Sequence, residues 1–187
     1  MRKLFSFNLI TLEGFFEGPQ QDISWHNVDA EFNEFAIEQL NTIGVILFGR
    51  VTYLGMASFW PTPFALENDP VVAELMNSFS KVVISRTLDK AEWNNTRLIA
   101  DHVAEEVTRL KQQSGKDLAI FGSANLTASL MRMGLVDELR IMVNPVILGQ
   151  GTPLFKGVTE KVDLKLINTR VFRNGNVMLY YQIAGLQ

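Results

Sequence analysis

Three short stretches of this sequence combine a flexible backbone with hydrogen-bond donors, and each directly follows an apolar run. Glycine lets a ligand approach the backbone closely, free N–H groups at the start of a helix attract anions, and arginine and hydroxyl side chains add donors. Each stretch therefore suits a phosphate group, although an ordinary capped helix or a solvated turn has a similar composition. The stretches contain Gly49, Arg50 and Thr52; Ser85 and Arg86; and Gly122, Ser123, Ala124, Asn125 and Leu126.

Acid–base chemistry has few candidate residues. The two histidines, His26 and His102, fall on different expected elements and do not make a metal site by themselves. His26 follows the polar segment of residues 13–25 and is a candidate proton donor near neutral pH. Glu34 is a second candidate, but its spacing from Glu31 also fits a solvated helix face. The catalytic residue is therefore left open, and no metal is expected.

Composition narrows the classes of partner. With 17 basic and 20 acidic residues, the chain has a formal charge of -3 and no basic excess to hold nucleic acid or an anionic membrane. It has no cysteine, which excludes a disulfide framework and favours the reducing cytoplasm. No apolar run approaches the roughly 18 residues of a membrane helix. The expected partner is a small-molecule substrate.

The elements that must position the three stretches alternate between strands and helices. Strands alternating with helices indicate an α/β fold with a largely parallel sheet and helices on both faces. Because the carboxyl ends of parallel strands meet at one edge, the three stretches are expected to bind one multiply phosphorylated, nucleotide-sized ligand. Strands are expected at residues 4–10, 43–48, 82–84, 118–121 and 139–143, and helices at residues 31–40, 71–79, 102–113 and 123–133.

Local signals set the helix starts and the end of the chain. Asn68 or Asp69, followed by Pro70, is expected to cap the helix over residues 71–79, and Asp101 the helix over residues 102–113. Residues 164–172 alternate in character, a turn follows at residues 173–176, and residues 177–183 are expected to return antiparallel.

In their order and spacing these motifs resemble the dihydrofolate reductase-like family, in the branch related to the reductase domain of bacterial riboflavin biosynthesis proteins. The resemblance covers nearly the whole chain. It implies a three-layer sandwich with a largely parallel central sheet and a C-terminal antiparallel hairpin, forming one domain over residues 1–187. The residues that carry it are 11–15, 49–53, 83–87, 121–124, 134–139 and 145–155.

The resemblance also implies a cofactor and a reaction. NADPH is expected, with residues 49–52 near its phosphates, Ser85 and Arg86 near the adenosine ribose phosphate, and residues 122–126 under the pyrophosphate. Hydride transfer to a small planar heterocycle or carbonyl compound is then expected. A narrower alternative is reduction of 5-amino-6-(5-phosphoribosylamino)uracil in riboflavin biosynthesis. A homodimer is also expected.

Two departures from the family pattern bear on function. In dihydrofolate reductases themselves a carboxylate on the first helix binds the pterin, and the corresponding position here is Asn33. Dihydrofolate reduction is therefore the less favoured alternative. The family also often has two glycines where this chain has Gly122 and Ser123, and the serine hydroxyl offers a donor to a phosphate. A further alternative is a nucleotide-binding module that has lost catalysis.

Overall fold

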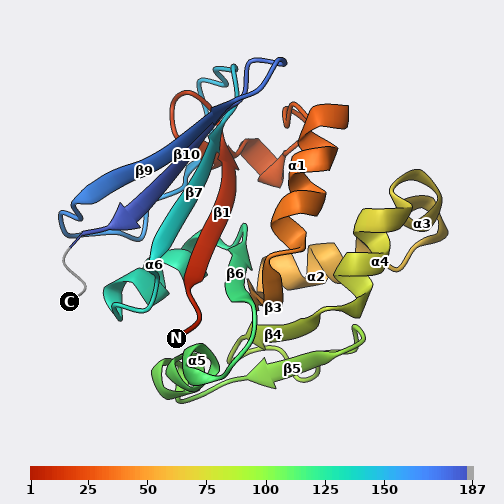
Figure 1. Cartoon of the computed structure of the whole chain (residues 1–187), viewed down its shortest axis with the longest axis vertical. Coiled ribbons are helices and arrows are strands. Elements are labelled where there is room, and N and C mark those ends of the chain that lie inside the picture. Colours follow the sequence, from red (N-terminus) through yellow and green to blue (C-terminus); the bar gives the residue numbers. More distant parts are fainter. Residues whose placement is uncertain (185–187) are drawn as a thin grey trace.

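The computed structural model describes residues 1–184, and its main feature is an eight-stranded sheet between helices (Figure 1). The strands are β1 (Leu4–Ile10), β2 (Phe15–Glu17), β3 (Ile43–Gly49), β4 (Ser80–Ile84), β5 (Thr96–Ile99), β6 (Asp117–Phe121), β7 (Glu138–Val143), β8 (Thr152–Pro153), β9 (Leu164–Val171) and β10 (Val177–Ile183). The helices are α1 (Ala30–Leu40), α2 (Arg50–Phe59), α3 (Pro63–Asn68), α4 (Pro70–Ser78), α5 (Val103–Gln112) and α6 (Ala124–Arg132), with a 3₁₀ turn at Pro19–Gln21.

The sheet is parallel over most of its width. Its order is β5-β4-β3-β6-β1-β7-β10-β9, and neighbours from β5 to β7 are all parallel. β10 runs antiparallel to both β7 and β9. The predicted α/β fold, with a largely parallel sheet and a C-terminal hairpin, is confirmed. The short strands β2 and β8 form a separate antiparallel pair.

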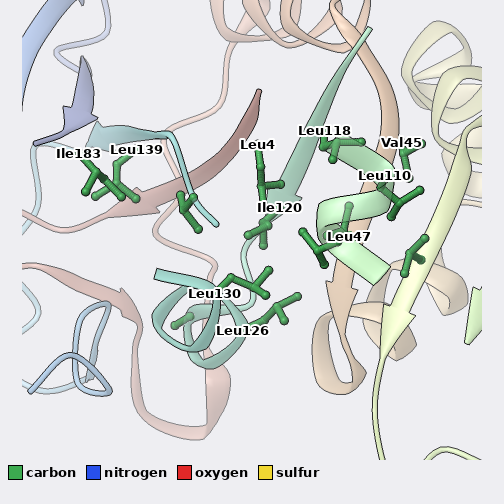
Figure 2. Close-up of a cluster of buried hydrophobic side chains, with 14 of the residues drawn as sticks. Leu4, Val45, Leu47, Leu110, Leu118, Ile120, Leu126, Leu130, Leu139 and Ile183 are labelled. Atoms are coloured by element: carbon green, nitrogen blue, oxygen red, sulfur yellow. The ribbon is translucent and has the colours of Figure 1, made fainter. Parts of the chain in front are cut away.

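One face of the sheet packs against α5 and α6. Leu4, Leu47 and Ile120 point to this face and are fully buried. Figure 2 shows them facing the α6 residues Leu126 and Leu130. Side chains alternate across a strand, so the neighbours of these residues must fill the other face.

The opposite face packs against α1, α2 and α4. Phe5, Phe48 and Val83 are fully buried there, together with Leu40 of α1 and Met76 of α4. Both faces are therefore dry in the middle of the sheet, which explains why these strands are nearly continuous apolar runs in the sequence.

Two predicted caps are wrong. Asp69 lies where α3 passes directly into α4, and its carboxylate does not cap α4 but lies near the Asn33 amide, with Oδ1 to Nδ2 at 3.5 Å. α5 begins after His102, which is left-handed at φ 53°, and no side chain caps it, so Asp101 is not the cap. The start of α4 at Pro70 agrees with the prediction.

β5, α3 and the β2–β8 pair were not predicted from the sequence. These elements are short, and most of their residues are not buried, so they carry little periodic signal. Across residues 1–184, no helix combines the length and the hydrophobicity that crossing a membrane requires.

Candidate functional site

The first and third predicted stretches are in direct contact. The backbone N–H of Gly49 donates to Ser123 Oγ at 3.0 Å, and the N–H of Ser123 donates to Thr52 Oγ1 at 3.2 Å. β3 lies between β4 and β6, and its last residue, Gly49, pairs with Ile84. The Ser85 stretch therefore begins beside Gly49. The structure brings the three stretches to one edge of the sheet, as predicted.

The turn from β6 into α6 has an unusual backbone. Gly122 and Ser123 are both left-handed, with φ of +59° and +53°. A Cβ added at Gly122 would lie 3.3 Å from Thr52 Cγ2, and the Gly122 N–H donates to Phe7 O at 3.1 Å. Glycine suits both the backbone angle and the close approach, whereas the left-handed serine costs some strain.

Two helices begin at this corner without a side-chain cap. Gly49 precedes α2 and Ser123 precedes α6, and no side chain within residues 1–184 accepts a capping hydrogen bond from either helix start. The first amides of a helix have no intrahelical acceptor and carry the positive end of its dipole. The two helix starts therefore present unused donors to the same corner, an arrangement that suits the oxygens of a diphosphate.

The arginines beside this corner are exposed. Arg50 and Arg86 are both exposed, and neither forms an ion pair with the residues that the structure describes. Ser85 Oγ accepts hydrogen bonds from the N–H groups of Thr87 and Leu88, both at 3.1 Å. Ser85 thus shapes the turn that presents Arg86. Direct contact of its hydroxyl with a phosphate stays a prediction.

The five residues of the third stretch divide by burial. Ala124 and Leu126 are 7% and 8% exposed and belong to the core, so only their backbone could face a ligand. Asn125 is exposed. Their roles in cofactor binding remain predictions, and the strongest part is the backbone at the start of α6, because the N–H groups of Gly122 and Ser123 already donate to Phe7 O and Thr52 Oγ1.

A buried polar cluster beneath α6 was not foreseen. Ser6 Oγ and Thr127 Oγ1 are 2.8 Å apart, and Asn8 Nδ2 donates to Ser6 Oγ at 2.9 Å. Thr127 lies on the first turn of α6, where its N–H donates to Ser123 O. This cluster ties β1 to the start of α6 and so helps to fix the corner. The polar residues within the apolar pattern of β1 were the available signal.

The environment of His26 does not support proton donation near neutral pH. Burial lowers its pKa from 6.5 to about 4, although the charge of Asp22 acts in the opposite direction. Its Nε2 is buried and has no hydrogen-bond partner within residues 1–184, and its ring meets Trp25 edge-on with centroids 4.6 Å apart. At pH 7 the imidazole is therefore neutral, and it has no imidazolium proton to donate.

The segment that carries His26 is held by asparagines. The Asn27 N–H donates to Asn144 Oδ1 at 2.9 Å, and Asn27 Nδ2 donates to Asn174 O at 2.8 Å. Asn176 Nδ2 donates back to Asn27 O at 2.8 Å. Asn144 and Asn176 are fully buried. The end of β7 and the turn between β9 and β10 thus position this segment, through contacts that sequence spacing could not reveal.

The acidic candidates on α1 have different surroundings. Glu34 is exposed, as the solvated-face interpretation predicts. Glu31 accepts a hydrogen bond from the Arg173 N–H at 3.0 Å, and this bond lowers the pKa of its carboxyl group. No group of three or more histidine, aspartate or glutamate side chains within residues 1–184 is placed to hold a metal ion.

Two grooves lie outside the three stretches. One, of about 630 Å³, is lined by the β2–β8 region, including Glu17, Gln20 and Gln150. The other, of about 830 Å³, lies between α2 and residues 88–94 and has Tyr53 and Trp93 in its wall. Neither groove is lined by a residue of the predicted cofactor site.

Residues 2–178 match the RibD C-terminal domain family. The uncharacterized protein YyaP of Bacillus subtilis is 36% identical over 178 residues, covering 94% of this chain and 92% of YyaP.

Two solved structures share the fold. A Shewanella sp. PV-4 protein, proposed to act in riboflavin biosynthesis, has a TM-score of 0.74 at 19% identity, covering 98% of this chain and 99% of its own. A dihydrofolate reductase of Enterococcus faecalis, solved with NADP(H), has a TM-score of 0.65 at 16% identity, covering 98% of this chain and 97% of its own. At these identities the likeness shows the fold alone.

Proposed function

The chain belongs to the RibD C-terminal domain family, and from that membership we propose that it is an NADPH-dependent reductase. Its substrate is a small planar heterocycle or carbonyl compound. The observation that carries the proposal is the contact of Ser123 with Gly49 and Thr52, which joins two strand ends into one donor-rich corner. Arg50 and Arg86 extend that corner with exposed positive charge.

The corner offers the hydrogen-bond donors and the positive charge that the phosphates of a dinucleotide require. The amides at the starts of α2 and α6 would hold the pyrophosphate, and Gly122 allows the close approach of Thr52 that brings the two helix starts together. Arg50 or Arg86 would pair with the 2′-phosphate. When bound, NADPH supplies the hydride, while the protein binds and orients the reactants.

Reduction also consumes a proton. His26 is neutral at pH 7 because burial lowers its pKa to about 4, and Glu34 faces solvent. We therefore propose that water delivers the proton and that no side chain of the chain acts as the essential acid. A pH profile of turnover without an ionisation between pH 5 and 8 would support this assignment.

The narrower substrate proposal is a pyrimidine of riboflavin biosynthesis, as in 5-amino-6-(5-phosphoribosylamino)uracil reduction. Family membership supports it. A cytoplasmic location is consistent with the cysteine-free sequence.

The test combines calorimetry with turnover. We expect NADPH to bind the natural protein and Gly122→Ala to weaken that binding, because the new methyl group meets Thr52 at a left-handed position. Gly149→Ala is the matched control, since Gly149 is also left-handed, at φ +74°, but has no atom within 4 Å of an added Cβ.

Turnover then separates a reductase from a binding module. NADPH oxidation is followed with a panel of pyrimidines, pteridines and carbonyl compounds. Binding without oxidation of NADPH by any of them would favour the non-catalytic alternative, and no binding at all would refute the assignment of the corner.

A further inference from the structure

Asn8 of β1 has a side-chain amide that is satisfied at one end only. Its Nδ2 donates to Ser6 Oγ at 2.9 Å, whereas its Oδ1 is buried and has no hydrogen-bond partner within residues 1–184. The residue as a whole is only 3% exposed. A buried carbonyl oxygen without a donor is costly, so this position favours a donor that a ligand supplies.

Asn8 is the first residue of β1 beyond its pairing with β6. The last pair of these two strands is Phe7 with Phe121, and the next N–H, that of Gly122, donates to Phe7 O at 3.1 Å. β1 continues to Ile10 and stays paired with β7. β1 and β6 therefore part beside Asn8, at the point where the chain after β6 turns into α6.

The side chain of Asn8 lies on the face of the sheet that α6 covers. It contacts Ser6, whose hydroxyl oxygen is 2.8 Å from Thr127 Oγ1 on the first turn of α6. The Thr127 N–H donates to Ser123 O at 2.9 Å. A short chain of hydrogen bonds thus joins Asn8 to the helix start whose amides, in the proposed function, hold the pyrophosphate.

The strand order gives the direction of a dinucleotide along this edge of the sheet. In the order β4-β3-β6-β1, the Ser85 stretch follows β4, α2 starts after β3, and α6 starts after β6. With the 2′-phosphate at Arg50 or Arg86, the adenosine half lies on the β3–β4 side of the pyrophosphate. The nicotinamide half then extends the other way, over β6 toward β1 and Asn8.

The nicotinamide half carries the kind of donor that Asn8 Oδ1 requires. Its carboxamide offers N–H groups and its ribose offers hydroxyl groups, and a carbonyl oxygen accepts a hydrogen bond from either. The amide of Asn8 is already oriented by Ser6, with the nitrogen toward the hydroxyl. The free oxygen is therefore held in place before a ligand binds.

Two other buried polar atoms within residues 1–184 lack a partner, His26 Nε2 and Asn176 Oδ1. They flank Asn27 rather than a helix start, since Asn176 Nδ2 donates to Asn27 O. Asn176 also contacts Met142, which belongs to the core cluster of Phe35 on the α1 face. Of the three atoms, Asn8 Oδ1 is the one that hydrogen bonds join to the cofactor corner.

We propose that Asn8 Oδ1 accepts a hydrogen bond from the nicotinamide half of the cofactor and so fixes the end of the cofactor that carries the hydride. The inference rests on the proposed NADPH-dependent function. It adds to that function a binding residue in the middle of β1, outside the three donor-rich stretches.

The first test compares two ligands on one variant. Calorimetry measures the binding of NADPH and of adenosine 2′,5′-bisphosphate, which lacks the nicotinamide half, to the natural protein and to Asn8→Leu. We expect Asn8→Leu to weaken NADPH binding by about tenfold and to change bisphosphate binding by less than about twofold. An equal loss for both ligands would show that Asn8 only supports the corner, and an unchanged NADPH affinity would show that there is no contact. Either result overturns the proposal.

Ser6→Ala is the matched control within the same cluster. It removes the hydrogen bonds that join Asn8 to Thr127 but keeps the Asn8 carbonyl. The ratio of NADPH affinity to bisphosphate affinity should therefore stay at the natural value in Ser6→Ala and fall in Asn8→Leu. An equal fall in both variants contradicts the proposal. Asn8→Ala, which introduces no new atoms, gives the same comparison if Asn8→Leu does not fold.

A third ligand distinguishes the two possible donors. In the 3-acetylpyridine analogue of NADPH a methyl group replaces the amide nitrogen, and the ribose is unchanged. If the carboxamide is the donor, the natural protein should bind the analogue about tenfold more weakly than NADPH, and Asn8→Leu should abolish this difference. If a ribose hydroxyl is the donor, the natural protein should bind both alike, and Asn8→Leu should weaken both. Each pattern supports the proposal.

The same measurements separate failure of the inference from failure of the proposed function. A natural protein that binds neither NADPH nor the bisphosphate refutes the NADPH-dependent function and the inference with it. A natural protein that binds NADPH with an affinity independent of Asn8 refutes the inference alone.

Discussion

Two regions of the molecule place positively charged side chains beside backbone groups at the end of a helix or strand. In one region the charged groups are exposed, and in the other the charged group is buried. At the ends of β3, β4 and β6, Arg50 and Arg86 are exposed and two helix starts lack side-chain caps. At the end of α4, Lys81 is 1% exposed, and its Nζ donates to the carbonyls of Met76, Asn77 and Phe79 at 3.0, 3.1 and 2.7 Å.

The difference lies in how much hydrogen-bonding capacity the protein itself uses. All three Nζ protons of Lys81 have acceptors, and the ammonium lies 4.4 Å from the centroid of the Trp93 ring. Those contacts satisfy carbonyls that α4 leaves unpaired at its end. At the strand-end corner the N–H groups of Gly49, Gly122 and Ser123 also have acceptors, but among residues 1–184 no side chain caps the first amides of α2 or α6, and the two arginines form no ion pair. Hydrogen-bonding groups that the protein itself satisfies indicate a structural role. Groups that the protein leaves without a partner indicate a ligand site.

The largest effect is therefore expected at Lys81. Lys81→Met should lower the free energy of unfolding by about 3 kcal/mol, because it leaves buried carbonyls without donors. Burial lowers the pKa of Lys81 to about 8, so its ammonium form still predominates at pH 7. Urea unfolding measures the loss. Lys90→Met, at an exposed lysine, should change stability by less than about 0.5 kcal/mol. Similar losses in both variants would break the comparison.

The next effect concerns His26, whose pKa lies near 4 when folded and near 6.5 when unfolded. Between these values the unfolded chain binds a proton that the folded chain does not. The contribution of neutral His26 to the free energy of unfolding is therefore fully present above pH 6.5. It declines as the pH falls to 4, by roughly 3 kcal/mol at most. His26→Gln should remove this part of the pH dependence. Unfolding curves of both proteins at pH 7 and pH 4 give the difference, and parallel losses would contradict it.

At the strand-end corner the expected effect is on binding. Arg50→Ala and Arg86→Ala should each weaken NADPH binding by about 10- to 100-fold, the value of one charged hydrogen bond, with stability nearly unchanged. NADPH should bind the natural protein more tightly than NADH, and the variant that loses this preference identifies the arginine at the 2′-phosphate. Arg109→Ala, at an exposed arginine paired with Glu106, is the control. Equal calorimetric affinities for NADPH and NADH would contradict the prediction.

The same contrast explains what could be predicted from the sequence. β1, β3 and β6 are buried on both faces, so their apolar runs predict them nearly to the residue. The donors of the corner could also be found, since each follows its strand directly. Both signals are local. The α/β class and the three donor-rich stretches could be predicted from such signals and from their order along the chain, whereas the expected cofactor came from the family resemblance.

Features that depend on distant residues could not be predicted. The burial that makes His26 neutral comes from packing. Asn27 accepts a hydrogen bond from Asn176, which lies 149 positions later in the sequence. Lys81 appears in the sequence as an ordinary charged residue ahead of an apolar run, and only the fold places it under the end of α4. Asp69 looked like a cap because the sequence does not show that α3 passes directly into α4.

The smallest effect is expected at Asn33. Dihydrofolate should be a poor substrate, because an amide cannot form the charge-assisted pair with a pterin that a carboxylate forms. Asn33→Asp should help little, since Asn33 Nδ2 lies 3.5 Å from Asp69 Oδ1 and a carboxylate there meets a like charge. A gain of less than about tenfold, or 1.4 kcal/mol, is expected in kcat/KM for dihydrofolate.

Removing the like charge sharpens this last prediction. Asn33→Asp combined with Asp69→Asn restores a single carboxylate at the contact, so its gain should exceed that of Asn33→Asp alone. Glu34→Gln, at an exposed carboxylate, should leave the rate unchanged. If the natural protein reduced dihydrofolate well and Glu34→Gln abolished the reaction, the substrate acid would be Glu34. The contrast between exposed and engaged groups would then hold on α1 as well, because the exposed carboxylate would belong to the reaction and the engaged pair of Asn33 and Asp69 would not, whereas the assignment of the pterin position to Asn33 would fail.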